Sequence, residues 1–464
     1  MRFSVAATAD RILPEQLATR ARPLLDRLDA LVFAADERGA AGRTSLVAFA
    51  IRIVAAVFVF VSQVLMARWM GSFEYGIFVL VWTTVVIVGT LTCLGFGTSV
   101  IRFIPQYRER GELAELRGVM SASRGFVLVV STLFTVVGVL GVWLFSDSID
   151  SYYVIPFYLG MICMPMIALS DVLEGVARAN SWAILALTPI YLLRPILTLA
   201  VMGGALLAGF EADAQTAMVA AILATWATAL YQLAAIAPSA GREVSGVKPN
   251  YRMREWILVS APIFLVEGFF FMLTNADVLM VGWFMQPTDV AVYFAAVKTL
   301  ALVHFVYFAV KAGAAQRYAQ YAHSENPAKL AEFARETVTW TFWPSLAMGV
   351  VVLAVGKPML MLFGEGFDAG YPLLFVLVLG IVARSAVGPA ESMLTMTGHQ
   401  NVCAAVYGIT LAVNIALNFA LIPYFGLWGA AIATCVAMLC EAMLLYVTVR
   451  RKLGIAMFVA AGAA

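Results

Sequence analysis

The fold class is set by the stretch LMARWMGSFEYGIFVLVWTTVVIVGTLTCLGFGTSVIRFIPQY, residues 65–107. It joins the end of one apolar block, 45–68, to a second apolar block, 75–96, through the short sequence GSFEY. Each block has the length, about 20 residues, at which an α-helix crosses the hydrocarbon core of a bilayer. The stretch therefore predicts two membrane helices that run in opposite directions.

The same pattern repeats along the chain, which has 464 residues, a mean hydropathy of +0.90 and only 12% charged residues. Soluble proteins carry about 25% charged residues. The blocks are long and lack period-two alternation, which excludes a β-barrel. We expect an all-α polytopic membrane protein with about twelve spans: 45–68, 75–96, 124–145, 152–174, 182–208, 214–236, 256–281, 289–311, 337–356, 371–394, 403–422 and 429–449.

The positive charges alternate between the two sides of this predicted topology. With the N-terminus inside, 24 of the 30 lysines and arginines lie in inside segments, whereas two, Arg68 and Lys357, lie outside. Lys and Arg favour cytoplasmic loops. We therefore expect a multi-pass protein of the bacterial inner membrane with both termini in the cytoplasm.

These spans predict five segments. The first 43 residues carry seven arginines and no apolar signal-peptide core, so we expect a charged amphipathic segment on the cytoplasmic membrane surface. The loops are too short for a folded catalytic domain. The predicted segments are 1–44 (cytoplasmic N-terminal segment), 45–236 (N-lobe), 237–255 (cytoplasmic linker), 256–449 (C-lobe) and 450–464 (cytoplasmic tail).

An internal repeat relates the two lobes. VLMARWMGSFEYGIF (64–78) resembles VLMVGWFMQPTDVAVYF (278–294), and SDVLEGVARANSW (170–182) aligns with AESMLTMTGHQNV (390–402). The similar offsets predict two six-helix lobes related by a parallel pseudo-two-fold repeat. In transporters with such repeats, substrate binds between the halves near the midplane.

Several motifs resemble a known family. Met70-Gly71 followed by Glu74-Tyr75-Gly76, and a second span that ends in a pattern of glycine, arginine and proline, resemble the polysaccharide-transporter branch of the MOP superfamily, the Wzx-type oligosaccharide flippases. The resemblance covers about residues 44–452. Its further motif positions are Gly95, Gly97, Arg102, Phe103, Pro105 and Tyr107, then Asn275-Ala276-Asp277 and GLWGAAIAT (426–434).

The resemblance implies a flippase that moves undecaprenyl-pyrophosphate-linked oligosaccharide from the cytoplasmic to the periplasmic leaflet by alternating access, for surface polysaccharide biosynthesis. It also implies a monomer in the lipid bilayer, with other polysaccharide-assembly enzymes as candidate partners. The alternative is a cation-coupled multidrug exporter of the MATE type from the same superfamily. An exporter of cationic drugs should favour acidic groups in its cleft.

Four cations fall within the predicted spans: Arg52, Arg194, Lys298 and Arg384. A cation at the bilayer centre costs about 2.5–3.5 kcal/mol on insertion scales, so each requires an explanation. Arginine can hold phosphate oxygens bidentately. We expect these cations to line a central cavity and bind pyrophosphate, although structural ion pairs or snorkelling to the interface would also explain them.

Five acidic residues in or near spans are candidates for ion coupling or gating: Asp171, Glu267, Asp277, Glu391 and Glu441. Deep carboxyl groups either bind protons or balance cations on other helices. Arg384 and Glu391 are seven residues apart, so we expect them on one helix face. Asp277 lies near the outer end of its span and is a candidate gate.

Motifs for other chemistry are missing from the sequence. It has no Walker loop, no HExxH and no GxSxG, and its five cysteines form no CxxC pair or Cys/His cluster. We therefore expect no enzyme activity, no cofactor, no metal site and no nucleic-acid partner.

Overall fold

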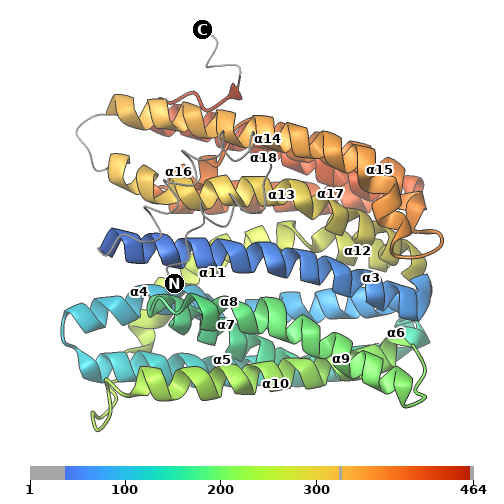
Figure 1. Cartoon of the computed structure of the whole chain (residues 1–464), viewed down its shortest axis with the longest axis horizontal. Coiled ribbons are helices and arrows are strands. Elements are labelled where there is room, and N and C mark those ends of the chain that lie inside the picture. The colour runs from blue at the N-terminus through green and yellow to red at the C-terminus, as the bar shows by residue number, and fades with distance from the viewer. Residues whose placement is uncertain (1–36, 323–326, 460–464) are drawn as a thin grey trace, which may run out of the picture.

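A computed structural model describes residues 37–322 and 327–459, and Figure 1 shows helices that lie side by side along one direction. The described residues contain no strand. The first half of the chain forms α3 (Glu37–Leu91), α4 (Phe96–Glu109), α5 (Leu113–Leu144), α6 (Ser151–Met161), α7 (Met164–Ala179), α8 (Ala183–Thr188), the π-helical turn η2 (Pro189–Leu193), α9 (Arg194–Leu207) and α10 (Ala214–Gly241).

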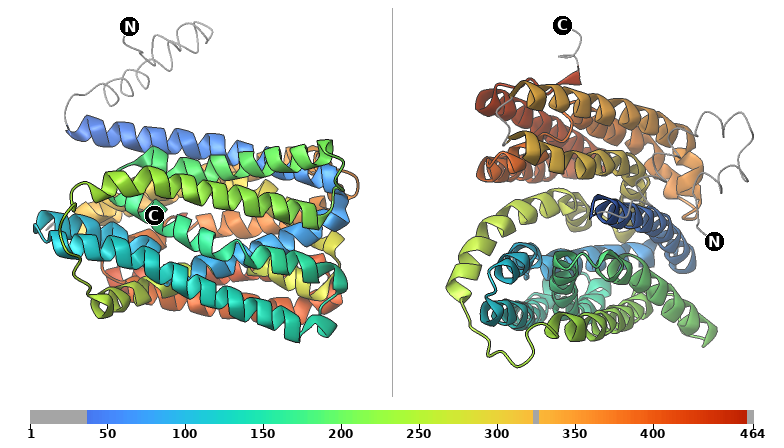
Figure 2. Two further views of the ribbon diagram at one scale, coloured as in Figure 1. Left: turned by 90° about the horizontal axis from the view of Figure 1, so that it is seen from below. Right: turned by 60° about the vertical axis from the view of Figure 1, so that its left-hand side comes forward.

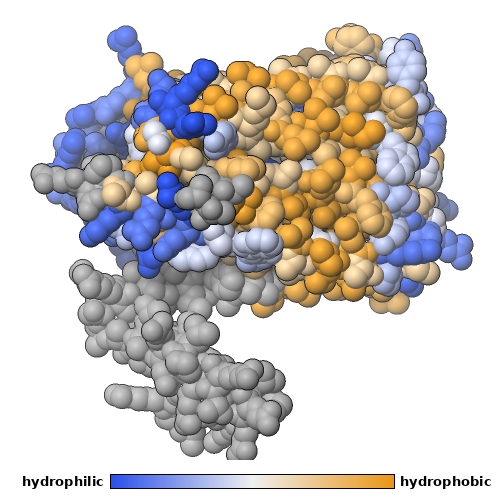
Figure 3. Space-filling view, turned by 90° about the horizontal axis from the view of Figure 1, so that it is seen from above, coloured by the Kyte–Doolittle hydropathy of each residue, from blue (hydrophilic) through white to orange (hydrophobic). Residues whose placement is uncertain are grey.

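The second half forms another set of antiparallel helices. Its bounds are α11 (Met253–Leu273), α12 (Ala276–Phe284), α13 (Pro287–Ala322), α14 (Pro327–Met361), α15 (Tyr371–Ser385), α16 (Ala390–Met396), α17 (Gln400–Phe425) and α18 (Leu427–Leu453). Figure 3 shows a broad hydrophobic band with more hydrophilic surface at both ends of the helices. This surface fits a multi-pass membrane protein.

Within the described chain, ten helices are long and apolar enough to cross a membrane, or eleven when the α6–α7 pair, bent by 45°, counts as one span. One of the ten, Val54–Glu109, has 56 residues, about 84 Å if it were straight.

That long element reverses direction at Gly71. The backbone of Gly71 has φ 74° and ψ 171°, and the Tyr75 hydroxyl donates a hydrogen bond of 2.8 Å to Oε1 of Gln63. Residues twelve apart in a straight helix are about 18 Å apart. The chain therefore turns back at Gly71, and this element contains two spans. With these two counted separately and α6–α7 counted as one span, the described residues contain the twelve spans that the sequence predicts.

The two halves pack together at one end, which we call the outer end because the sequence predicts that it faces the periplasm. One buried cluster there contains residues of both halves, among them Met70 and Tyr75 from the first and Tyr293 and Phe363 from the second. Figure 1 shows the first part of α3 between the two groups of helices, and α3 packs on α13.

Close backbone contact seals this outer end. A Cβ placed on Gly76 would lie 1.7 Å from the carbonyl oxygen of Pro287, which belongs to the other half. Nε of Arg68 donates a hydrogen bond of 2.5 Å to the carbonyl oxygen of Leu362. Only a glycine permits the first contact.

At the inner end, α11 joins the halves. The indole of Trp256 donates to the Tyr107 hydroxyl at 2.9 Å, and the Ser260 hydroxyl bonds that of Ser99 at 2.7 Å, so the start of α11 packs on α4. Its far end leads into α12, which packs on α13, α17 and α18 in the second half. In Figure 2, right, α11 follows a curved path from one group of helices to the other.

Residues 1–36 lie outside the described residues, so the amphipathic N-terminal segment stays a prediction. The same holds for the lobe boundaries at 236 and 256. The all-helical membrane fold itself is confirmed.

Candidate functional site

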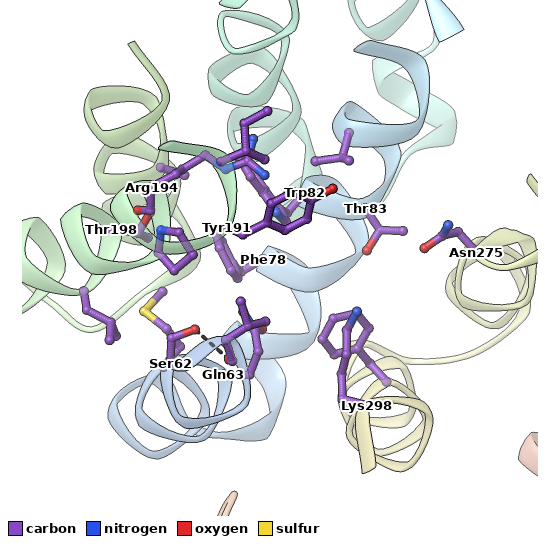
Figure 4. Close-up of a pocket in the computed structure, with 18 of the residues that line it drawn as sticks. Ser62, Gln63, Phe78, Trp82, Thr83, Tyr191, Arg194, Thr198, Asn275 and Lys298 are labelled. Atoms are coloured by element: carbon purple, nitrogen blue, oxygen red, sulfur yellow. Dashed lines mark hydrogen bonds between the residues drawn. The ribbon is translucent and has the colours of Figure 1, made fainter. Parts of the chain in front are cut away.

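A cavity of about 250 Å³ lies between the two halves, toward the outer end. Side chains from α3, η2 and α9 line it on one side, and side chains from α11, α13 and the α11–α12 junction line it on the other. Figure 4 shows Arg194 and Lys298 on opposite sides of this cavity, with the polar side chains of Gln63, Thr83 and Asn275 also labelled around it. The structure thus brings two of the four predicted cations to one space.

Both cations lie over aromatic rings. The guanidinium carbon of Arg194 is 5.5 Å from the centroid of the Trp82 ring, and Nζ of Lys298 is 4.6 Å from that of Phe294. A ring attracts a cation without cancelling its charge. No Asp or Glu is among the described residues that line this cavity, so its positive charge is available to a ligand.

The position of Arg194 follows from the local sequence. Arg194 is the first residue of α9 and directly follows the π-helical turn η2, which begins at Pro189. Proline has no backbone N–H and cannot complete a regular α-helical ladder, which favours such a break. Wide turns of this kind occur often at functional sites.

A second cavity of about 390 Å³ adjoins the first toward the inner end. Arg194 lines both, whereas the carboxyl groups of Asp171, Glu174 and Glu267 line only the inner one of the two. Thr98 donates a hydrogen bond of 2.8 Å to Oε1 of Glu267, which connects α4 with α11. The cleft is therefore basic toward the outer end and mixed in charge toward the inner end.

Arg384 lies elsewhere. It is buried inside the second half, where its Nη2 is 2.6 Å from Oε1 of Glu441 and its guanidinium carbon is 4.3 Å from the centroid of the Tyr307 ring. This group lines a separate cavity of about 80 Å³. The predicted cation of α15 is thus held in a buried ion pair, and Glu441 balances a cation on another helix.

Glu391 has a different partner from the one that its sequence spacing suggests. α15 ends at Ser385, Gly388 has φ 58°, and α16 begins at Ala390. The helix break means that Arg384 and Glu391 do not share a helix face, and that expectation is wrong.

The partners of Glu391 come instead from α13. Nζ of Lys311 lies 3.1 Å from Oε1 of Glu391, and the Tyr307 hydroxyl donates to the same oxygen. Glu391 and Lys311 line a cavity of about 440 Å³ that Glu267 also lines.

Asp277 is buried at the start of α12. Its carboxylate accepts a hydrogen bond of 2.8 Å from the Tyr293 hydroxyl and one of 2.9 Å from the backbone N–H of Val278. Oδ2 of Asp277 also lies 3.5 Å from the Thr434 hydroxyl. These contacts hold α12 against α13 and α18.

The backbone of Arg52 belongs to α3, but its side chain lies outside the described part of the structure.

The cavity of about 250 Å³ between the halves is also lined by residues that the sequence analysis did not identify, chiefly Trp82 and Gln63. Gln63 could have been identified, because it is a polar residue within an apolar block. Trp82 could not, because aromatic residues are common in membrane helices. No group of three or more His, Cys, Asp or Glu among the described residues could hold a metal ion.

Comparison with solved structures finds the same fold in transporters of the MOP superfamily. A multidrug resistance MATE family transporter in an inward-facing conformation has a TM-score of 0.68 at 15% identity, over 86% of this chain and 93% of that one. The lipid II flippase MurJ in an inward closed conformation has a TM-score of 0.68 at 14% identity, over 87% of each chain.

A MOP superfamily transporter from Pyrococcus furiosus has a TM-score of 0.58 at 15% identity, over 88% of this chain and 94% of that one. No curated protein sequence matches.

The family model "MatE" matches residues 262–420. The profile "Polysaccharide biosynthesis protein" matches residues 41–315, more than half of the chain. The chain therefore belongs to the polysaccharide biosynthesis protein family, and it has the same fold as these solved transporters.

Proposed function

We propose that this protein is a flippase that moves undecaprenyl-pyrophosphate-linked oligosaccharide from the cytoplasmic to the periplasmic leaflet of the bacterial inner membrane. The observation that carries the proposal is the pair Arg194 and Lys298, which face one cavity from opposite halves, with no Asp or Glu among the described residues that line it. A pyrophosphate must lose hydration to cross the membrane, and fixed positive charge offsets that loss.

Alternating access gives this arrangement a mechanical consequence. A cavity whose two cations belong to different halves can bind a diphosphate by drawing the halves together around it. Arginine presents a fork that matches phosphate oxygens, whereas lysine provides a compact charge. We infer that pyrophosphate bridges Arg194 and Lys298 and that the glycan occupies the larger cavity toward the inner end.

The experiment is deletion of the gene in its host, extraction of lipid-linked intermediates, and complementation. We expect the deletion to accumulate undecaprenyl-pyrophosphate oligosaccharide on the cytoplasmic leaflet and to lose surface polymer. Arg194→Gln and Lys298→Met should reach the membrane but fail to restore polymer. Arg110→Gln, which changes an exposed cation in the α4–α5 loop, is the matched control and should restore it.

A cation-coupled exporter of the MATE type is the second candidate, and the carboxyl groups of Asp171 and Glu267 at the inner cavity favour it. In that case the deletion would leave lipid-linked intermediates normal and sensitise cells to cationic dyes. Asp171→Asn and Glu267→Gln would then abolish dye resistance, and Arg194→Gln would retain it.

A further inference from the structure

A separate cavity of about 310 Å³ lies outside the cleft, on the flank of the first half at its inner end. It is formed by the beginning of α5, the end of α10 and the loop that follows α10. Its lining residues are Arg117, Met120, Ser121, Arg124, Ala240, Gly241, Val244, Ser245 and Gly246. Nothing in the proposed transport cycle uses this cavity.

Two arginines on one face of α5 point their side chains into this cavity. Arg117 and Arg124 are two helical turns apart. Nη1 of Arg117 donates a hydrogen bond of 2.5 Å to the carbonyl oxygen of Val247, and Nε of Arg124 donates one of 2.7 Å to that of Met120. A guanidinium has five N–H donors, so each arginine is fixed by the backbone and keeps further donors for a ligand.

Two nearby acidic groups, Glu115 and Glu243, pair with other arginines. Glu243 lies 2.9 Å from Nη2 of Arg108, and Oε1 of Glu115 lies 2.8 Å from Nη2 of Arg252. In the described chain, neither Arg117 nor Arg124 forms a salt bridge, and no Asp or Glu lines the cavity. The cavity therefore carries a net positive charge and would attract an anion.

The cavity also lies at the edge of the lipid-facing surface. On α5 the large exposed apolar residues begin at Val129, which is 61% exposed, and continue with Leu133. Val129 is five residues, or about 7.5 Å, beyond Arg124. On α10 the last large exposed apolar residues are Leu230 and Tyr231, nine or more residues before Ala240, which lines the cavity. Along the helix axes the cavity thus lies beyond the inner edge of the exposed apolar surface, at a depth that suits a lipid headgroup.

We propose that this cavity binds the phosphate headgroup of an anionic phospholipid of the cytoplasmic leaflet. Basic pockets at the cytoplasmic ends of membrane helices suit such headgroups, because the leaflet itself is anionic. Arg117 and Arg124 bind the phosphate, and the hydroxyl of Ser245 can donate to its ester oxygens. This site acts independently of the transported glycan.

The test uses the full-length protein in detergent, with phosphatidylglycerol as the probe. We expect phosphatidylglycerol to raise the melting temperature and to persist as an adduct in native mass spectrometry, whereas phosphatidylcholine does neither. Arg124→Gln should weaken phosphatidylglycerol binding about tenfold, which corresponds to a loss of about 1.4 kcal/mol in binding free energy. Arg124→Lys should retain part of the affinity.

Arg451→Gln, which changes an exposed cation in the last turn of α18, is the control and should bind as the unmodified protein does. Arg117→Gln provides a second variant if Arg124→Gln folds poorly. Equal binding of phosphatidylcholine, or unchanged binding by both glutamine variants, would overturn the proposal. Inorganic phosphate that binds as tightly as phosphatidylglycerol would show a free-phosphate site and would overturn the assignment to a lipid.

Discussion

The cleft and the interior of the second half both contain buried cations, but they hold them differently. In the cleft, Arg194 and Lys298 lie over the rings of Trp82 and Phe294 and face a cavity that no carboxyl group of the described residues lines. In the second half, Arg384 is bound by Glu441 within a cavity of about 80 Å³. The cleft cations keep their charge for a ligand, whereas the charge of Arg384 is neutralised within the protein.

The contrast predicts opposite consequences for mutation. Removal of one partner of a buried ion pair leaves the other charge uncompensated. Within the described residues neither Arg194 nor Lys298 forms a salt bridge, so we expect the removal of either charge to affect substrate binding more than the stability of the fold. Stability and transport should therefore respond separately in the two regions.

The largest expected effect is on stability. Arg384→Met leaves Glu441 buried without its cation and should lower the free energy of unfolding by about 3–5 kcal/mol. Thermal unfolding of the purified protein measures it. Arg384→Met combined with Glu441→Leu should recover most of the loss, and a double variant as unstable as the single one would show that the pair is not what stabilises this region.

The next effect is on transport. Arg194→Gln or Lys298→Met should lower transport of the lipid-linked substrate at least tenfold, because each removes a charge-assisted contact worth about 1.5–3 kcal/mol. The unfolding temperature should stay near that of the unmodified protein. Flipping in reconstituted vesicles measures the rate. If these variants unfold at temperatures as low as that of Arg384→Met, the cleft cations also stabilise the fold, and the two regions do not differ in this respect.

A smaller effect on stability concerns the hydroxyl of Tyr307, which donates a hydrogen bond to Glu391. Tyr307→Phe keeps the ring under Arg384 but removes the donor to Glu391. Because Lys311 still pairs with Glu391, we expect a loss of only about 1–2 kcal/mol in unfolding free energy. Chemical denaturation would detect it, and a loss as large as that of Arg384→Met would mean that Lys311 contributes little.

The smallest effect should come from the ring under the cleft cation. Trp82→Leu removes the surface on which Arg194 lies, a contact worth about 0.5–2 kcal/mol. Transport should fall a few-fold, less than in Arg194→Gln, with Arg194 still present. If Trp82→Leu and Arg194→Gln lower the transport rate equally, the ring acts on substrate directly rather than through the arginine.

The spans could be predicted from sequence, but their internal breaks could not. Length and hydropathy identify 371–394 as one span, yet the chain breaks between Ser385 and Ala390, and a similar break separates α11 from α12. A hydropathy average is insensitive to one glycine with positive φ, such as Gly388. For this reason the spacing of Arg384 and Glu391 led to the wrong prediction that they share one helix face.

The candidate site could be predicted only in part. The cost of a cation in a membrane identified Arg194, Lys298 and Arg384 as residues that require a partner. Which partner each has depends on contacts between helices far apart in the chain, such as the 57 residues that separate Arg384 from Glu441. The spacing of residues along the chain carries no information about those contacts, so the cavity lined by Arg117 and Arg124 also became visible only in the structure.

The backbone contact between Gly76 and Pro287 has a consequence for the direction in which the cleft opens. A methyl group at Gly76 would lie 1.7 Å from the Pro287 oxygen, so Gly76→Ala acts as a wedge between the halves. The added methyl group should destabilise the arrangement in which the outer ends meet. We therefore expect Gly76→Ala to shift the population toward an arrangement in which the two halves are separated at the outer end.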